Sequence, residues 1–276
     1  MKEQEILKLD NISLTYQTKT DEVKAIKNLS FSLNEGEFLS IIGPSGCGKT
    51  TVLSIIAGLI KPSSGKIKVP NTDKIGYMLQ KDHLFDWRTI EHNIILPLEI
   101  KKLKDVEHIN YVRNLLTKYG LKDFAKNYPK ELSGGMRQRA ALIRTLSFNP
   151  DLLLLDEPFS ALDYQTRLEV CDDVYNIIKD EHKSTILVTH DISEAISMSD
   201  KIIVLSARPA QVKHVHKLNL KNDTPLKRRE LPEFGKWFEL LWKELNEWKL
   251  KIAKIFLMNI ISIYQIYAKS PLSYGV

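Results

Sequence analysis

The loop that most constrains the fold lies between two apolar segments near the N-terminus. It reads Gly43-Pro-Ser-Gly-Cys-Gly-Lys-Thr50 and fits the pattern G-x-x-x-x-G-K-[ST]. The apolar run 38–42 before it predicts a buried strand, and the segment 51–57 after it predicts a helix. In this order, backbone N–H groups and the positive end of a helix converge on one anion. The sequence therefore predicts a phosphate-binding loop in an α/β fold.

The residues of this loop have predicted contacts with a nucleotide. Lys49 supplies a positive charge for the β- and γ-phosphates, and the Thr50 hydroxyl is the expected Mg²⁺ ligand. Cys47 is either a thiol activated by the helix N-terminus or a small residue that the loop tolerates, and we adopt the second interpretation. The predicted cofactor-binding residues of this loop are Gly43, Pro44, Ser45, Gly46, Cys47, Gly48, Lys49, Thr50 and Thr51.

A second apolar segment ends in two adjacent carboxylates. Residues 152–155 are all leucine, as expected of a central parallel strand that is buried on both faces, and Asp156 and Glu157 follow them. Ligands gather at the carboxyl ends of strands in open α/β sheets. Since an unpaired buried charge is costly, we predict that Asp156 binds Mg²⁺ and that Glu157 polarises a water. In the alternative interpretation, the two acids only cap the next turn.

His190 ends another apolar, β-branched segment, Ile186-Leu-Val-Thr-His190. At the end of a parallel strand its imidazole is able to reach a γ-phosphate or to orient the attacking water. A single histidine at a strand end is more commonly an ordinary hydrogen-bonded residue. The catalytic interpretation therefore depends on the phosphate loop and the carboxylates being present.

The segment Leu132-Ser-Gly-Gly predicts a second helix N-terminus. Ser133 has the chemistry of an N-cap, Gly134 and Gly135 permit close backbone approach, and residues 136–146 have a helical pattern. One ATP molecule needs only one such loop. A second loop, far away in the sequence, suggests that it serves the nucleotide of another molecule.

With all three segments present, the chain resembles the ATP-binding cassette (ABC) family over roughly residues 5–220. The resemblance implies a head-to-tail dimer in which each signature segment, 133–138, caps the γ-phosphate bound by the other copy. It also implies roles for single residues: adenine stacking by Tyr16, Mg²⁺ sensing and coupling by Gln80, the signature residues Ser133, Gly134, Gly135 and Gln138, the catalytic base Glu157, the interface loop 160–163 and the switch histidine His190.

Composition limits the remaining possibilities. The chain has 276 residues and a net charge of +6, with no run of Lys and Arg interleaved with aromatic residues, which argues against nucleic-acid binding. Its two cysteines, Cys47 and Cys171, exclude a disulfide framework and suit a reducing compartment. We see no secretory signal and no stretch of roughly 20 apolar residues. We therefore expect a soluble or peripheral protein, so any transport pore must belong to another chain.

The predicted fold is an α/β P-loop NTPase (RecA-like) core with an inserted helical subdomain. Helical periodicity from residue 89 to residue 146 separates the phosphate loop from the carboxylate strand. We assign residues 1–83 and 151–220 to the core, 84–150 to the helical subdomain and 221–276 to a C-terminal helical extension. Strands are expected at 6–14, 31–33, 65–69 and 75–79.

The segment after Gln80 indicates a membrane partner. Leu84, Phe85 and Trp87 are large apolar residues in a polar, loop-like setting, where they form either a socket for a short helix of a permease or part of the subdomain core. The segments 80–93 and 204–209 resemble the ATPases of nitrate, sulfonate and taurine importers. Asp86 and Ala210 depart from the usual Pro and Gly of that group, and importers of pyrimidine precursors share the same pattern.

The C-terminal segment has aromatic residues at helical spacing. Trp237, Phe238, Leu241, Trp242, Leu245 and Trp248 predict an amphipathic helix, which we expect to pack on the parent domain. Residues 251–269 also form an amphipathic pattern, with three alternatives open: the membrane interface, the permease or padding of the fold.

The function predicted from these features is that of the ATP-hydrolysing subunit of an ABC importer for a small nitrate-, sulfonate-, taurine- or pyrimidine-like solute. The expected cofactors are ATP and Mg²⁺. The expected partners are a second ATPase subunit, taken to be another copy of the chain, the transmembrane permease subunits and, indirectly, a solute-binding receptor. This places the protein at the cytoplasmic face of the cell membrane. The alternatives are a soluble ABC ATPase of iron–sulfur cluster assembly, an exporter ATPase and a non-enzymatic binding module.

Overall fold

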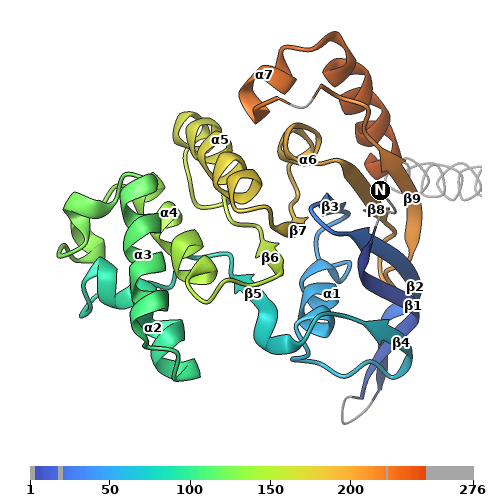
Figure 1. The fold of residues 1–276 in the computed structure, drawn as a ribbon. Coiled ribbons are helices and arrows are strands. Elements are labelled where there is room, and N and C mark those ends of the chain that lie inside the picture. The colour runs from blue at the N-terminus through green and yellow to red at the C-terminus, as the bar shows by residue number, and fades with distance from the viewer. Residues whose placement is uncertain (1–3, 18–20, 222, 247–276) are drawn as a thin grey trace, which may run out of the picture.

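The computed structural model describes residues 4–17, 21–221 and 223–246, and its strands form two sheets (Figure 1). The larger sheet has the order β5-β6-β7-β3-β8-β9, in which β9 alone is antiparallel to its neighbour. Its bounds are β3 Phe38–Ile42, β5 Ile75–Met78, β6 Leu152–Asp156, β7 Ser184–Val188, β8 Lys201–Leu205 and β9 Val212–Lys217.

The β6 strand is buried on both faces, as its run of leucines predicts. Leu153 and Leu155 pack into one hydrophobic cluster, whereas Leu152 and Leu154 pack into another on the opposite face. Each of these side chains is fully buried. The carboxylate pair therefore follows a strand that is fixed from both sides, which restrains its position.

The smaller sheet is antiparallel and has the order β2-β1-β4. Its bounds are β1 Glu5–Gln17, β2 Glu22–Asn34 and β4 Ser64–Lys68. The strand expected at 31–33 is confirmed but is longer than predicted, because β2 begins at Glu22 and pairs with β1 from Gln17 back to Glu5. The charged residues at the start of β2 lack a clear alternation of apolar and polar side chains. Pairing with β1, rather than the residue pattern, therefore sets the length of β2.

Helices cover both faces of the larger sheet. α1, Lys49–Ile56, packs between the two sheets, since its apolar residues share a cluster with β1, β2, β3 and β6. The opposite face holds α5 and α6, and α2, α3 and α4 form a block beside α5 (green in Figure 1). The bounds are α2 Ile90–Lys101, α3 Val106–Lys118, α4 Gly134–Leu146, α5 Tyr164–Asp180, α6 Ile192–Met198 and α7 Pro225–Arg229. The predicted helical character of 89–146 is therefore confirmed.

The C-terminal helix, residues 232–246, packs on the core as expected. Leu241 is fully buried, and Trp237 and Phe238 pack against the cluster formed by α6 and β8. Glu244 is 3.0 Å from His216 Nε2, which fastens the helix to β9. Trp248 and the pattern at 251–269 lie outside the described residues. Within the described ranges, no helix is both long and apolar enough to cross a bilayer.

Candidate nucleotide-binding and hydrolysis site

The phosphate loop connects β3 to α1. Gly48 has φ +123°, a backbone conformation that residues with a side chain rarely adopt, and it precedes the helix without any side-chain cap. The first N–H groups of α1 are therefore left free for an anion. The Lys49 ammonium is buried and donates to the carbonyl oxygens of Gly43 at 3.0 Å and Pro44 at 3.3 Å. These contacts hold the Lys49 ammonium against the backbone of the phosphate loop.

A hydroxyl and a carboxylate meet beside this loop. Thr50 Oγ1 donates to Asp156 Oδ1 at 3.2 Å, and Tyr77 Oη donates to Asp156 Oδ2 at 3.3 Å. Burial raises the pKa of Asp156, and the hydrogen bonds from Thr50 and Tyr77 oppose that rise only in part. Tyr77, which the sequence analysis missed, has its pKa raised to about 12 by burial and by the charge of Asp156, so it remains a donor.

The Thr50–Asp156 pair fits a magnesium ion. Mg²⁺ prefers oxygen ligands and is often held by one or two carboxylates together with the phosphates of its substrate. No cluster of three or more His, Cys, Asp or Glu suited to a metal occurs within the described ranges, so the protein offers a partial set of this kind. Gln80, also predicted to bind the metal, donates instead to the Ser160 hydroxyl at 3.3 Å. Its role as a ligand stays a prediction.

Glu157 follows β6 in an unusual backbone conformation. Its φ is +46°, which is uncommon for a residue with a side chain, and its N–H donates to the Val188 carbonyl at 2.8 Å. His190 Nδ1 lies 3.1 Å from Glu157 Oε2. The turn therefore holds Glu157 in a left-handed conformation, and its carboxylate lies beside the imidazole of His190. Strain held by surrounding structure is a common property of functional residues.

The turn that follows Glu157 is tied to two other segments. Ser160 Oγ donates to the Glu157 carbonyl at 3.0 Å, and Gln138 of α4 donates to the Pro158 carbonyl. Gln80, just after β5, reaches Ser160 as described above. Three segments that contain predicted site residues therefore contact one turn: Gln80 after β5, Gln138 of α4 and the backbone of Glu157.

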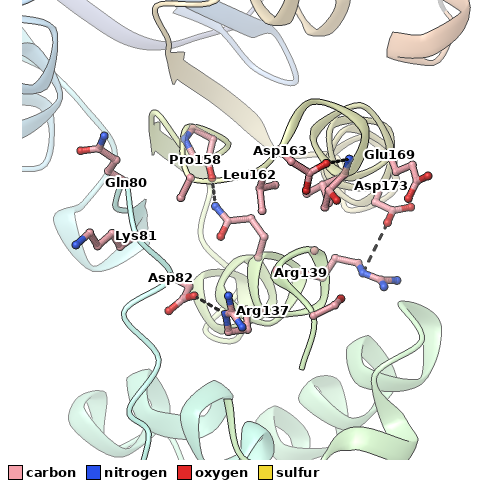
Figure 2. A pocket seen from close by; sticks show the side chains of 17 residues that line it. Gln80, Lys81, Asp82, Arg137, Arg139, Pro158, Leu162, Asp163, Glu169 and Asp173 are labelled. Atoms are coloured by element: carbon pink, nitrogen blue, oxygen red, sulfur yellow. Dashed lines mark hydrogen bonds and ion pairs between the residues drawn. The ribbon is translucent and has the colours of Figure 1, made fainter. Parts of the chain in front are cut away.

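The signature segment forms a separate concavity. Ser133 Oγ accepts from the Met136 N–H at 3.3 Å and caps α4, as predicted. A Cβ on Gly135 would lie 2.8 Å from Val170 Cγ2, so only glycine allows α4 to approach α5 this closely. Ser133, Gly134 and Gly135 line a cavity of about 520 Å³ with side chains of α5 and of the turn after Glu157 (Figure 2). No residue of 43–51 lines this cavity.

Cys47 and Tyr16 are two further predicted binding residues. Cys47 is buried, and burial raises the pKa of its thiol, which favours the tolerated-residue interpretation over a reactive thiol. Tyr16, near the end of β1, is 40% exposed and free to stack on a base. Arg208, to which the sequence analysis gave no contact, donates to the Gly46 carbonyl at 2.9 Å.

The sheet order explains which residues come together. Because β6, β7 and β3 are neighbours, their carboxyl ends bring Asp156, Glu157, His190 and the phosphate loop to one edge. The signature segment instead lines the cavity of about 520 Å³ described above, and none of these strand-end residues lines it. The fold and these strand-end groups define a nucleotide-binding protein of the P-loop class.

Comparison with known proteins confirms and narrows this class. A family model described as ABC transporter matches residues 26–160. The uncharacterised ABC transporter ATP-binding protein YtlC of Bacillus subtilis is 48% identical over 248 residues, covering 87% of this chain and 95% of YtlC. The aliphatic sulfonates import ATP-binding protein SsuB of Bacillus cereus is 40% identical over 82% of this chain and 89% of its own length. The taurine import ATP-binding protein TauB of Roseobacter denitrificans is 37% identical over 83% and 90%.

A solved structure agrees with the sequence relatives. The dimeric post-hydrolysis state of the ATP-binding cassette MJ0796, bound to ADP and Pi, superposes with a TM-score of 0.66 and 33% identity, covering 78% of this chain and 99% of that one. The chain therefore belongs to the ABC transporter family, and it is an ATPase of that family. The predicted fold class is confirmed.

Proposed function

We propose that this chain is the ATPase subunit of an importer and powers the uptake of a small sulfonate-like solute through separate permease subunits. The observation that carries the ATPase part is the Glu157–His190 contact of 3.1 Å beside the Thr50–Asp156 pair. The importer part is supported by relatives named for sulfonate and taurine import. Nitrate-like and pyrimidine-like solutes remain within the proposed range, because the receptor and permease select the ligand.

The proposed hydrolysis uses residues from three strand ends. Thr50 and Asp156 would hold the Mg²⁺ that accompanies ATP, and this ion would neutralise phosphate charge. Lys49 holds the β- and γ-phosphates, and Glu157 accepts the proton of the attacking water. His190 fixes the orientation of the Glu157 carboxylate through its Nδ1 contact. Gln80 links this centre to the turn at Ser160.

A second copy of the chain completes the proposed site. The signature residues line their own cavity, and the phosphate-loop residues do not line it. A head-to-tail dimer would place each signature cavity over the phosphate loop of the other copy. The dimeric MJ0796 structures support this arrangement. Each closed site would then contain donors from two chains around one γ-phosphate.

The proposed permease contact lies on the helical subdomain. Leu84 is buried, but Trp87 is 74% exposed and its ring lies 4.7 Å from that of Phe85. Beside Phe85, a predominantly apolar hollow of about 350 Å³ is lined by residues that include Leu96, Pro97 and Ile100. Leu84 therefore belongs to the subdomain core, whereas the socket interpretation for Phe85 and Trp87 stays a proposal. A short amphipathic helix of a permease suits such a groove and would hold the protein at the cytoplasmic membrane face.

The test is co-purification of tagged Glu157→Gln protein from detergent-solubilised membranes, with partners identified by mass spectrometry. We expect a multi-span permease, and we expect its recovery to fall when Trp87→Ala is added. Glu107→Gln, a change at an exposed residue of α3, is the control and should leave recovery unchanged. Recovery from the cytosol alone, with soluble partners, would contradict the importer and favour an ATPase of iron–sulfur cluster assembly.

A further inference from the structure

Arg167, in the first turn of α5, contacts two loops at once. One guanidinium nitrogen, Nη2, donates to the Leu162 carbonyl at 2.9 Å. On the other side, Nη1 lies 3.6 Å from Asp191 Oδ2, and Nε lies 3.9 Å from Glu194 Oε1. The planar fork of arginine suits such multiple contacts, which a lysine ammonium does not reproduce. Arg167 therefore joins the turn before α5 to the start of α6.

Glu194 connects this arginine to the segment that carries His190. It is almost fully buried, with 3% of its surface exposed, and accepts from the Thr189 hydroxyl at 2.6 Å. The same hydroxyl accepts from the Asp191 N–H at 3.0 Å. His190 lies between these two residues in the chain. The backbone on both sides of His190 is thus fixed by contacts that lead to Glu194.

Leu162 extends the connection to the signature segment. It lines the signature cavity, and a Cβ on Gly134 would lie 3.1 Å from Leu162 Cδ2. A molecule that binds in the cavity would therefore contact Leu162, whose carbonyl accepts a hydrogen bond from Arg167. In the other direction, the path ends at the Glu157 carboxylate through His190 Nδ1.

The burial of the Glu194 carboxyl group has an energetic cost. Removing a carboxylate from water costs several kcal/mol, and an ion pair only partly offsets that cost. Arg167 is itself largely buried, and its Nε atom has no hydrogen-bond partner among the described residues. An apolar pair of similar size would pack here at lower cost. The placement of a buried carboxyl group beside an arginine is consistent with a positioning role for both.

We propose that Arg167 and Glu194 are positioning residues that couple the turn 160–163 to His190 and so to the Glu157 carboxylate. The coupling rests on the proposed dimer, because the second copy would act on the signature cavity that Leu162 lines. Contact of the second copy with that cavity would then fix His190 and align the Glu157 carboxylate with the attacking water. Neither residue touches the nucleotide in this proposal.

The test compares Arg167→Lys, Arg167→Gln and Glu194→Gln with a control, Arg113→Gln, whose partly exposed ion pair with Glu91 joins α3 to α2. ATP turnover, nucleotide affinity and melting temperature are measured for each. We expect kcat to fall about tenfold with affinity within about twofold, the pattern of an interaction made only in the transition state. Arg167→Lys should lose turnover while melting within a few degrees of the wild type. The control should match the wild type.

A double-mutant cycle separates coupling from a purely structural role. If the two residues act through one path, the double variant Arg167→Gln/Glu194→Gln loses little more turnover than either single variant. Additive losses, or losses of turnover that follow melting temperature in every variant, would overturn the proposal. If the wild type hydrolyses ATP and the variants hydrolyse it equally fast, the positioning proposal would be overturned. The proposed function would then remain intact. A wild type without ATPase activity would instead contradict the proposed function.

Discussion

The phosphate loop and the signature segment are two glycine-containing helix N-termini with different surroundings. The phosphate loop is backed by Lys49 within the loop and by Asp156 at the adjoining strand end. The signature segment lines a cavity with side chains of α5, and no residue of the phosphate loop lines this cavity. In the proposed function, the phosphate loop therefore belongs to the site of its own chain, whereas the signature segment contributes to the site of the other copy.

The two helix starts also differ in their caps. Gly48 provides no side-chain hydrogen bond, so the N–H groups of α1 remain available to phosphate oxygens. Ser133 accepts from Met136 N–H and so uses one of those donors for its own helix. The phosphate loop is built to surround an anion, and the signature segment is built to approach one from a single side. This difference supports a site shared between two copies.

The largest expected effect is at the carboxylate of the phosphate-loop site. Glu157→Gln removes the proton acceptor and leaves the phosphate loop unchanged. Turnover should fall by at least about 100-fold, the usual contribution of a general base, while ATP affinity stays near the wild-type value. Steady-state hydrolysis and equilibrium titration with a fluorescent nucleotide measure the two quantities. Hydrolysis at the wild-type rate would contradict the assignment of Glu157.

Lys49→Ala tests nucleotide binding at the same loop. The ammonium lies against the loop carbonyls, and we expect it to bind the phosphates. Loss of a charged hydrogen bond of about 1.5–3 kcal/mol should weaken ATP binding about tenfold to 100-fold. Titration calorimetry measures this change, with Lys61→Ala, outside the loop, as the control. Unchanged affinity would mean that the loop is not the phosphate site.

Ser133→Arg tests the signature segment. The larger side chain would fill part of the signature cavity while leaving the phosphate loop of the same chain intact. Turnover should fall about tenfold, the scale of one lost transition-state contact, with affinity of the isolated monomer unchanged. Weakened binding to the monomer would indicate instead that the two loops serve one nucleotide within a chain.

The last expected effect is on stability rather than on turnover and concerns the buried carboxyl group of Glu194. Burial raises the pKa of Glu194 from an ordinary 4.5 to about 7, against the opposing influence of Arg167, His190 and the Thr189 hydroxyl and with a reinforcing charge on Asp191. Cys171 of α5 also faces this group. The folded protein therefore binds a proton that the unfolded chain releases. Its free energy of unfolding should decline as pH rises from about 4.5 through 7.

Glu194→Gln should lack this contribution. Its stability relative to the wild type should improve between pH 5 and pH 8 by up to about 3 kcal/mol, since one pKa unit corresponds to about 1.4 kcal/mol. Urea unfolding at the two pH values measures the change. A stability difference that does not vary with pH would show that Glu194 is ionised throughout this range.

Much of the site was predictable because its signals are local. The phosphate loop, the carboxylates after β6 and Ser133 as a helix cap are each encoded within about ten residues of sequence. Tyr77, Arg208 and Arg167 were not predictable in this way, since their partners lie 79, 162 and up to 27 residues away and meet only after the sheet has formed. The length of β2 was missed for the same reason, because pairing with β1 sets it.

The most direct test of the shared site is a complementation assay. Lys49→Ala and Ser133→Arg proteins are assayed for ATP turnover separately and as an equimolar mixture. In a head-to-tail dimer, the mixed species has one site with both defects and one site with none. We predict that the mixture recovers up to about one quarter of wild-type turnover, the share of intact sites after random mixing. A mixture no more active than the average of its two components would contradict a site built from two chains.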